Sequence, residues 1–191
     1  TEEQQLFYND YYDTYYNKLY QKNILKIEGV QVGFKLADGV KLPAYQTEGS
    51  AGFDVCANPS EFKSPNGEYD GLWIKPGQSK LIKTGLYPQI PEGYELQVRP
   101  RSGLAYKHGI TVLNSPGTVD EDFKSEIGVI LINHSDEAFV IKKGDRIAQL
   151  VLKQVPKANI YEIKEEDYKV DTERGEGGFG STDKTEKTDG K

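Results

Sequence analysis

The chain has 191 residues, of which 36% are hydrophobic and 28% are charged, and its formal net charge is −6. This length predicts a single domain with tails, and the modest apolar fraction favours a subunit that associates with copies of itself. The negative charge argues against a nucleic-acid duplex as the main partner, because phosphate binding requires clustered Lys and Arg. A nucleotide held in a small local site is compatible with it.

The sequence contains no membrane span or targeting signal that we can identify. Its single cysteine, Cys56, makes an intrachain disulfide impossible. No apolar run reaches the roughly 18 residues that a membrane span requires. The first residues are acidic, without Arg and without an apolar core, unlike a transit or secretory signal. We therefore expect a soluble, intracellular protein of the cytoplasm or nucleus, not a secreted one, with Cys56 as a small core residue.

Residues 1–27 form a Tyr-rich segment. Apolar and aromatic side chains recur there in pairs every four positions, at Tyr8, Tyr11, Tyr12, Tyr15, Tyr16, Leu19 and Tyr20. This spacing predicts an amphipathic helix over roughly residues 3–23. The simpler interpretation is an accessory helix that packs on its own domain or on a neighbouring subunit, and the alternative is a helix that binds a protein partner. Membrane adsorption is disfavoured because the polar face is mixed in charge.

Residues 28–170 alternate short apolar segments with Pro- and Gly-containing turns, which predicts an all-β domain. Strands are expected at residues 30–36, 72–74, 81–86, 94–98, 110–113, 127–132, 139–141, 147–152 and 159–163. Many short strands without intervening helices are typical of a β-sandwich or a jelly-roll-like barrel. Residues 58–71 contain two prolines and an Asn-Gly pair, which indicates an inserted surface loop or hairpin.

Beyond about residue 171 the sequence is rich in Gly, Thr and charged residues. This composition predicts a flexible arm over residues 171–182 and a disordered tail over residues 183–191. A glycine-rich linker is the simplest interpretation. The alternative is a lid over a triphosphate, in which Arg174 supplies positive charge, the Ser181 and Thr182 hydroxyls reach phosphate oxygens, and Phe179 stacks on a base.

Four stretches of the β domain carry groups suited to the same chemistry. Residues 50–54 place small residues before the carboxylate of Asp54, and residues 144–150 include Gln149. In residues 100–104, Arg101, Ser102 and Gly103 combine a guanidinium, a hydroxyl and an accessible backbone, a trio that suits phosphate oxygens. Residues 114–123 place Asp120 after a Pro-Gly turn and before an apolar strand, the arrangement of a carboxylate beside a narrow pocket.

These five stretches, in this order and spacing, resemble the five motifs of the trimeric dUTP pyrophosphatase (dUTPase) family, over roughly residues 30–182. The resemblance implies a jelly-roll-like subunit of a homotrimer, with active sites between subunits and each arm closing over a site formed mainly by its neighbours. It also implies the hydrolysis of dUTP to dUMP and pyrophosphate with Mg²⁺ on the triphosphate, which keeps uracil out of DNA and supplies dUMP.

The resemblance also implies a role for individual residues. Asp120 would activate the water that attacks the α-phosphate, and Asp54 would reach the metal through water, with no direct protein ligand. The phosphates would contact Arg101, Ser102, Gly103 and Gln149 of the domain and Arg174, Gly180, Ser181 and Thr182 of the arm. The uracil and deoxyribose would contact Asn114, Gly117, Thr118, Val119, Phe123 and Gly128, with Phe179 as a cap.

The sequence departs from the family pattern after Asp120. Phe123 stands where the family usually has Tyr, and Lys124-Ser125 stand where Arg or Gln and then Gly are usual. A Phe ring still presents a face that blocks a ribose 2′-hydroxyl. Two alternatives are a related dCTP deaminase and a pyrophosphatase-like binding protein that regulates a partner through its N-terminal helix. The intact Asp120 and the complete fifth motif favour the hydrolase.

Several polar residues outside these roles are expected to be structural or at the surface. They are His108, His134, Glu121 and Asp122, of which the two acidic residues are expected to be solvated. Asn133-His134-Ser135 fits a glycosylation sequon, although no secretory signal supports its use.

Overall fold

The computed structural model describes residues 29–58, 71–169, 171–172 and 175. The predicted N-terminal helix, nearly all of the predicted loop, and the arm residues Arg174, Phe179, Gly180, Ser181 and Thr182 therefore lie outside the described residues. The chain divides into two compact units, Thr1–Pro156 and Lys157–Lys191. No helix in the described ranges is long and apolar enough to cross a membrane.

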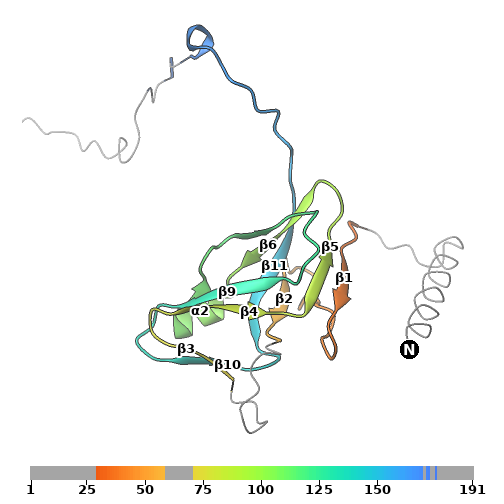
Figure 1. The fold of residues 1–191 in the computed structure, drawn as a ribbon, viewed down its shortest axis with the longest axis vertical. Coiled ribbons are helices and arrows are strands. Elements are labelled where there is room, and N and C mark those ends of the chain that lie inside the picture. Colours follow the sequence, from red (N-terminus) through yellow and green to blue (C-terminus); the bar gives the residue numbers. More distant parts are fainter. Residues whose placement is uncertain (1–28, 59–70, 170, 173–174, 176–191) are drawn as a thin grey trace, which may run out of the picture. The chain divides into compact units, whose positions relative to one another are not determined.

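The described strands all belong to the first unit, and every pairing between them is antiparallel (Figure 1). A four-stranded sheet has the order β2 (Phe53–Cys56), β11 (Arg146–Gln154), β6 (Tyr94–Arg99), β8 (Gly117–Val119). A three-stranded sheet has the order β4 (Ser79–Lys83), β9 (Gly128–Asn133), β7 (Ile110–Val112). Two further pairs are β1 (Gly33–Leu36) with β5 (Leu86–Gln89), and β3 (Leu72–Ile74) with β10 (Phe139–Ile141).

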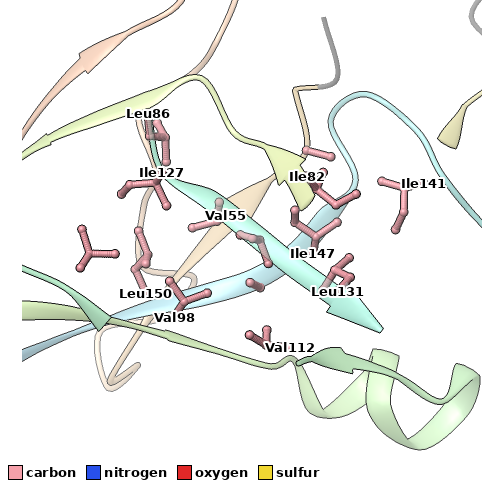
Figure 2. Close-up of a cluster of buried hydrophobic side chains, with 14 of the residues drawn as sticks. Val55, Ile82, Leu86, Val98, Val112, Ile127, Leu131, Ile141, Ile147 and Leu150 are labelled. Carbon is pink, nitrogen blue, oxygen red and sulfur yellow. The ribbon is translucent and has the colours of Figure 1, made fainter. Parts of the chain in front are cut away.

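Side chains from the two larger sheets form one hydrophobic core (Figure 2). Val55 and Leu150 enter it from the four-stranded sheet, and Ile82 and Leu131 from the three-stranded sheet. Along β9 buried and half-buried residues alternate, as a strand with one face on the core requires. This packing of sheet against sheet confirms the prediction of an all-β domain.

A short helix interrupts the strands, contrary to the prediction. α2 spans Ser102–His108 and ends at Gly109, whose left-handed conformation (φ 63°) lets its N–H reach the carbonyls of Leu104 and Ala105. Lys107 and His108 occupy the last turn, where cations interact favourably with the helix dipole. The helix has no buried residue, so the apolar periodicity by which helices are recognised in sequences is missing.

The predicted strands at residues 72–74 and 139–141 are confirmed as β3 and β10. The predicted strand at residues 81–86 is confirmed over residues 81–83, in β4, but its continuation is wrong, because Thr84 and Gly85 (φ 72°) separate β4 from β5. Residues 159–163 form no strand, because the described part of the chain offers them no neighbouring strand to pair with. β2 and β8 were not predicted as strands, since both are short and lie in stretches that contain turn residues.

The expected core position of Cys56 is also wrong. Phe53 and Val55 of β2 are buried, whereas Asp54 is half-buried and Cys56 is exposed. Successive side chains of a strand point to opposite faces, so Cys56 shares the outward face of Asp54 and not the core face of Val55.

Candidate functional site

A pocket of about 120 Å³ lies at the edge of the four-stranded sheet. All the residues of the β domain that were predicted to contact uracil or deoxyribose line it, together with Asp120: they are Asn114, Gly117, Thr118, Val119, Phe123 and Gly128. Val98 and Ile127 complete its wall. The structure therefore brings this predicted group together around one small cavity.

β8 accounts for the shape of the pocket. It pairs with β6 so that Gly117 lies opposite Val98 and Val119 opposite Leu96. A Cβ on Gly117 would come within 3.1 Å of Asn114 Nδ2 and 3.2 Å of Val98 Cβ, so a side chain here would require these neighbours to shift by a few tenths of an ångström. The two residues before it, Ser115 and Pro116, are exposed and do not line the cavity.

Asp120 follows directly after β8 at the rim of this pocket. It is exposed, and its carboxylate makes no hydrogen bond or ion pair with the residues that the structure describes. The backbone turns there, with the Phe123 N–H donating to the Asp120 carbonyl at 3.2 Å. Asp120 thus presents a carboxylate beside the cavity, without a charged partner among the described residues.

A second group of predicted residues surrounds Asp54. The Nε of Arg101 lies 3.3 Å from one oxygen of its carboxylate, and Arg146 Nη1 lies 3.0 Å from the other. Arg101 also donates from Nη1 to the Arg146 carbonyl at 2.8 Å. Two guanidinium groups against one carboxylate leave a positive charge uncompensated, and this excess favours an anionic ligand.

Gln149 is held next to this group by the sheet. Its Cα partners are Asp54 on β2 and Arg99 on β6, and its Nε2 donates to the Pro100 carbonyl at 3.0 Å. A Cβ on Gly52 would come within 2.8 Å of Gln149 Oε1 and 3.1 Å of the Leu150 carbonyl. Glycine at position 52 therefore leaves the room that the Gln149 amide occupies.

Two larger hollows adjoin the Asp54 group. One, of about 410 Å³, is lined by Asp54, Cys56 and Arg146 among others, and the other, of about 380 Å³, by Arg101 and Arg146 among others.

The thiol of Cys56 lies within this region. Its partial burial, and secondly the negative charge of the Asp54 carboxylate, raise the pKa of the thiol above its ordinary value. Arg146 belongs to the stretch 144–150, but its ion pair with Asp54 was not predicted; the antiparallel pairing that brings β11 beside β2 creates it.

Ser102 and Gly103 lie at the start of α2, immediately after Arg101. The first N–H groups of a helix lack partners within the helix, so this backbone can donate to an anion. The pocket that Asp120 lines, however, contains none of Arg101, Ser102, Gly103 or Gln149. In a single subunit the structure thus forms two groups, one around Asp120 and one around Asp54.

The same residues can be compared with the ligands that a divalent cation requires. In the described part of the chain no group of three or more His, Cys, Asp or Glu side chains could hold a metal ion. Each Asp54 oxygen faces one guanidinium and keeps further lone pairs, so it can accept a hydrogen bond from a metal-bound water. The donor set fits Mg²⁺ held by substrate phosphates and water, the mode that this ion prefers.

The chain thus combines an antiparallel sandwich, a small pocket with a carboxylate at its rim, and a positively charged group suited to a small anionic ligand. The dUTPase family model matches residues 38–183. A deoxyuridine 5'-triphosphate nucleotidohydrolase of Nautilia profundicola is 55% identical over 150 residues, which cover 78% of this chain and 96% of that protein. The chain belongs to the dUTPase family.

Solved structures agree with this assignment at the level of the fold. A mutant dUTPase of Staphylococcus bacteriophage 80alpha with dUpNHpp has a TM-score of 0.65 and 23% sequence identity, covering 80% of this chain and 98% of that one. A mutant dUTPase from phage phi11 of S. aureus, described with a structural Mg(II) ion, has a TM-score of 0.60 and 18% identity, covering 71% of this chain and 97% of that one.

Proposed function

We propose that this chain hydrolyses dUTP to dUMP and pyrophosphate, with Asp120 as the general base that deprotonates the water attacking the α-phosphate. The observation that carries the proposal is the free carboxylate of Asp120 at the rim of the 120 Å³ pocket. In-line attack of water on a phosphoryl group requires a positioned base within hydrogen-bond reach. The family and the printed activity of the Nautilia relative support the same reaction.

The small pocket receives uracil. Its walls combine the Asn114 amide with the backbone of Thr118, Val119 and Gly128, a set of donors and acceptors that can distinguish uracil from cytosine. The turn that closes this pocket would leave no room for a 5-methyl group, so that thymine is rejected sterically. Phe123, 37% exposed at the pocket, covers the deoxyribose and excludes a 2′-hydroxyl.

The triphosphate binds at the group around Asp54. A guanidinium has five N–H donors, and Arg101 uses its Nε and one Nη1 bond within the domain, so further donors can reach phosphate oxygens. Ser102, Gly103 and Gln149 add neutral donors. When Mg²⁺ is bound on the phosphates it would supply positive charge beside the leaving pyrophosphate, and Asp54 would accept a hydrogen bond from one of its waters.

The active unit is a homotrimer of jelly-roll-like subunits, in which the pocket of one subunit meets the Asp54 group of another. The separation of the two groups in one subunit supports this arrangement. Ile160 and Tyr161 of the second unit are 91% and 77% exposed, and apolar surface of this kind is typical of a segment that packs on another chain. The arm residues Arg174, Gly180, Ser181 and Thr182 then contact the terminal phosphate, and Phe179 caps the uracil.

A substrate panel tests this function. Pyrophosphate release is measured with dUTP, dCTP, dTTP and UTP, first with Mg²⁺ and then with a chelator, and ammonia release from dCTP is measured in parallel. We expect turnover with dUTP alone and its loss on chelation. Ammonia release from dCTP would identify a deaminase, and no turnover of any nucleotide would contradict the proposed function.

Asp120→Asn tests the general base. The amide keeps the shape of the side chain but cannot take a proton, so we expect kcat to fall by about 10²- to 10⁴-fold with nucleotide affinity largely kept. Single-turnover kinetics and equilibrium binding of dUTP check this. The matched control is Asp122→Asn, which removes a carboxylate two positions away on an exposed side chain. Near wild-type turnover of Asp120→Asn would show that another group is the base.

A further inference from the structure

We infer that Glu121 and Glu126 are positioning residues that clamp the pocket-forming turn to the segments on either side of β5. This inference rests on the proposed role of Asp120, which immediately precedes the first clamp. Both glutamates lie between Asp120 and Gly128, the two ends of the part of the pocket wall that follows β8. Glu121, expected to be solvated, is instead half-buried and hydrogen-bonded.

Each clamp has the same chemistry. The Gly93 N–H donates to the Glu121 carboxylate, and the Gly85 N–H donates to Glu126 Oε1 at 2.7 Å. Gly85 precedes β5 and Gly93 follows it, and both have positive φ (72° and 78°). Backbone N–H groups that donate to an ionised carboxylate form some of the stronger hydrogen bonds in proteins.

Two neutral hydrogen bonds strengthen the second clamp. The Ile127 N–H donates to the Leu86 carbonyl at 2.8 Å, and the Thr84 hydroxyl donates to the Ile127 carbonyl at 2.7 Å. Ile127 is buried and lines the pocket. These hydrogen bonds therefore help to fix the position of Gly128 and of the pocket wall relative to the start of β5.

The turn between the clamps has little other support. Asp122, Phe123, Lys124 and Ser125 are all exposed, so core packing does not hold them. Within the turn, Lys124 Nζ donates to the Glu121 carbonyl at 2.7 Å. The Gly93 carbonyl accepts a hydrogen bond at 2.8 Å from the N–H of Val155, the residue just after β11. The first clamp therefore connects the turn to backbone that the four-stranded sheet holds in place.

A loose turn would displace Asp120 and Phe123 together. Misplacement of a catalytic group by about 1 Å can cost about 10²-fold in rate, and a site needs support behind the groups that touch the substrate. Because Glu121 adjoins the base and Glu126 adjoins the pocket wall, loss of the first is expected to lower kcat and loss of the second to raise KM.

The test compares Glu121→Ala and Glu126→Ala with their Gln counterparts in the full-length protein. Gln keeps an oxygen that can accept the glycine N–H, so it should rescue most of the activity that Ala loses. We expect about a tenfold fall in kcat for Glu121→Ala, about a tenfold rise in KM for Glu126→Ala, and values within about threefold of wild type for the Gln variants. Asp122→Ala, an exposed neighbour of like charge, should match wild type.

The outcomes separate the possible failures. Ala variants with a lowered Tm but wild-type kcat and KM, assayed well below Tm, would reduce the clamps to a stabilising role and overturn the inference. If either Ala variant does not fold, the same kinetic measurements are made on Glu121→Asp or Glu126→Asp, which keeps the charge but shortens the side chain. A wild-type protein that does not hydrolyse dUTP would instead refute the proposed function.

Discussion

The two carboxylates of the candidate site have different surroundings. Asp54 lies between two guanidinium groups at 3.3 and 3.0 Å, whereas Asp120 has no charged partner in the described part of the chain. Both residues follow short turns in the sequence, so only the structure distinguishes the two environments.

Gly52→Ala tests the room that Gln149 needs. The added methyl group would push against Gln149 Oε1, 2.8 Å away, and crowd Val151 Cγ2 at 3.0 Å. Overpacking of this size costs about 1–3 kcal/mol, and displacement of the amide should raise the KM for dUTP by about threefold or more, since each lost hydrogen bond costs about 1 kcal/mol. Gly49→Ala is the matched control, because a Cβ there meets nothing within 4 Å. An unchanged KM would remove Gln149 from the phosphate site.

Cys56 reports on the same region through its reactivity. Partial burial and the nearby Asp54 raise its pKa, so a smaller fraction is thiolate at any given pH than in the unfolded chain. We expect alkylation by iodoacetamide to be slower in the folded protein than in urea at pH 8. The rate of alkylation should also rise with pH, with a midpoint at higher pH in the folded protein than in urea. A folded midpoint at or below the unfolded one would contradict this environment.

At the level of elements, the end of β9 depends on one buried amide. Asn133 is fully buried, donates from Nδ2 to the carbonyls of Ile74 and Glu137, and accepts at Oδ1 from the N–H and hydroxyl of Ser135. It thus joins β9, β3 and the turn before β10. In this conformation the amide is not available for glycosylation, although the sequence matches the sequon.

Asn133→Ala should therefore be one of the more damaging single changes in the domain. Removal of the amide takes away the hydrogen bonds to the Ile74 and Glu137 carbonyls and to Ser135, and we expect a loss of about 3 kcal/mol in the free energy of unfolding. Urea unfolding measures it. His134→Ala, a change at an exposed neighbour, should stay within about 0.5 kcal/mol of wild type. A loss below 1 kcal/mol for Asn133→Ala would mean that water replaces the amide.

At the level of the whole molecule, the proposed site requires more than one subunit and the arm. Removal of residues 172–191 deletes Arg174 and Phe179 and leaves the β domain intact. We expect kcat/KM for dUTP to fall by at least about 10²-fold, because closure of a lid completes such sites, while light scattering still gives the mass of a trimer. A truncated protein that is monomeric, or that retains full activity, would contradict the proposed role of the arm.

The periodicity of apolar residues in the sequence was sufficient to predict the all-β class and most strands, because apolar residues at alternate positions of a strand must face a core. The five motifs, read together, identified the family and the residues around the small pocket, from Asn114 to Gly128. The helix α2 was not predictable, since none of its residues is buried and its end is set by Gly109. Nor was the strand expected at residues 159–163 correct, because a strand exists only where a partner strand is available.

The sequence by itself determined the class of fold and the family, and it singled out Asp54, Asp120 and Arg101 as candidate site residues. Local chemistry and spacing along the chain carry that information. Only the tertiary structure decided that Arg146 joins Arg101 against Asp54, that Cys56 faces outward, and that Glu121 and Glu126 bind glycines in the segments on either side of β5. These contacts join segments far apart in the sequence, and they arise from strand register and packing, which no single segment of the chain specifies.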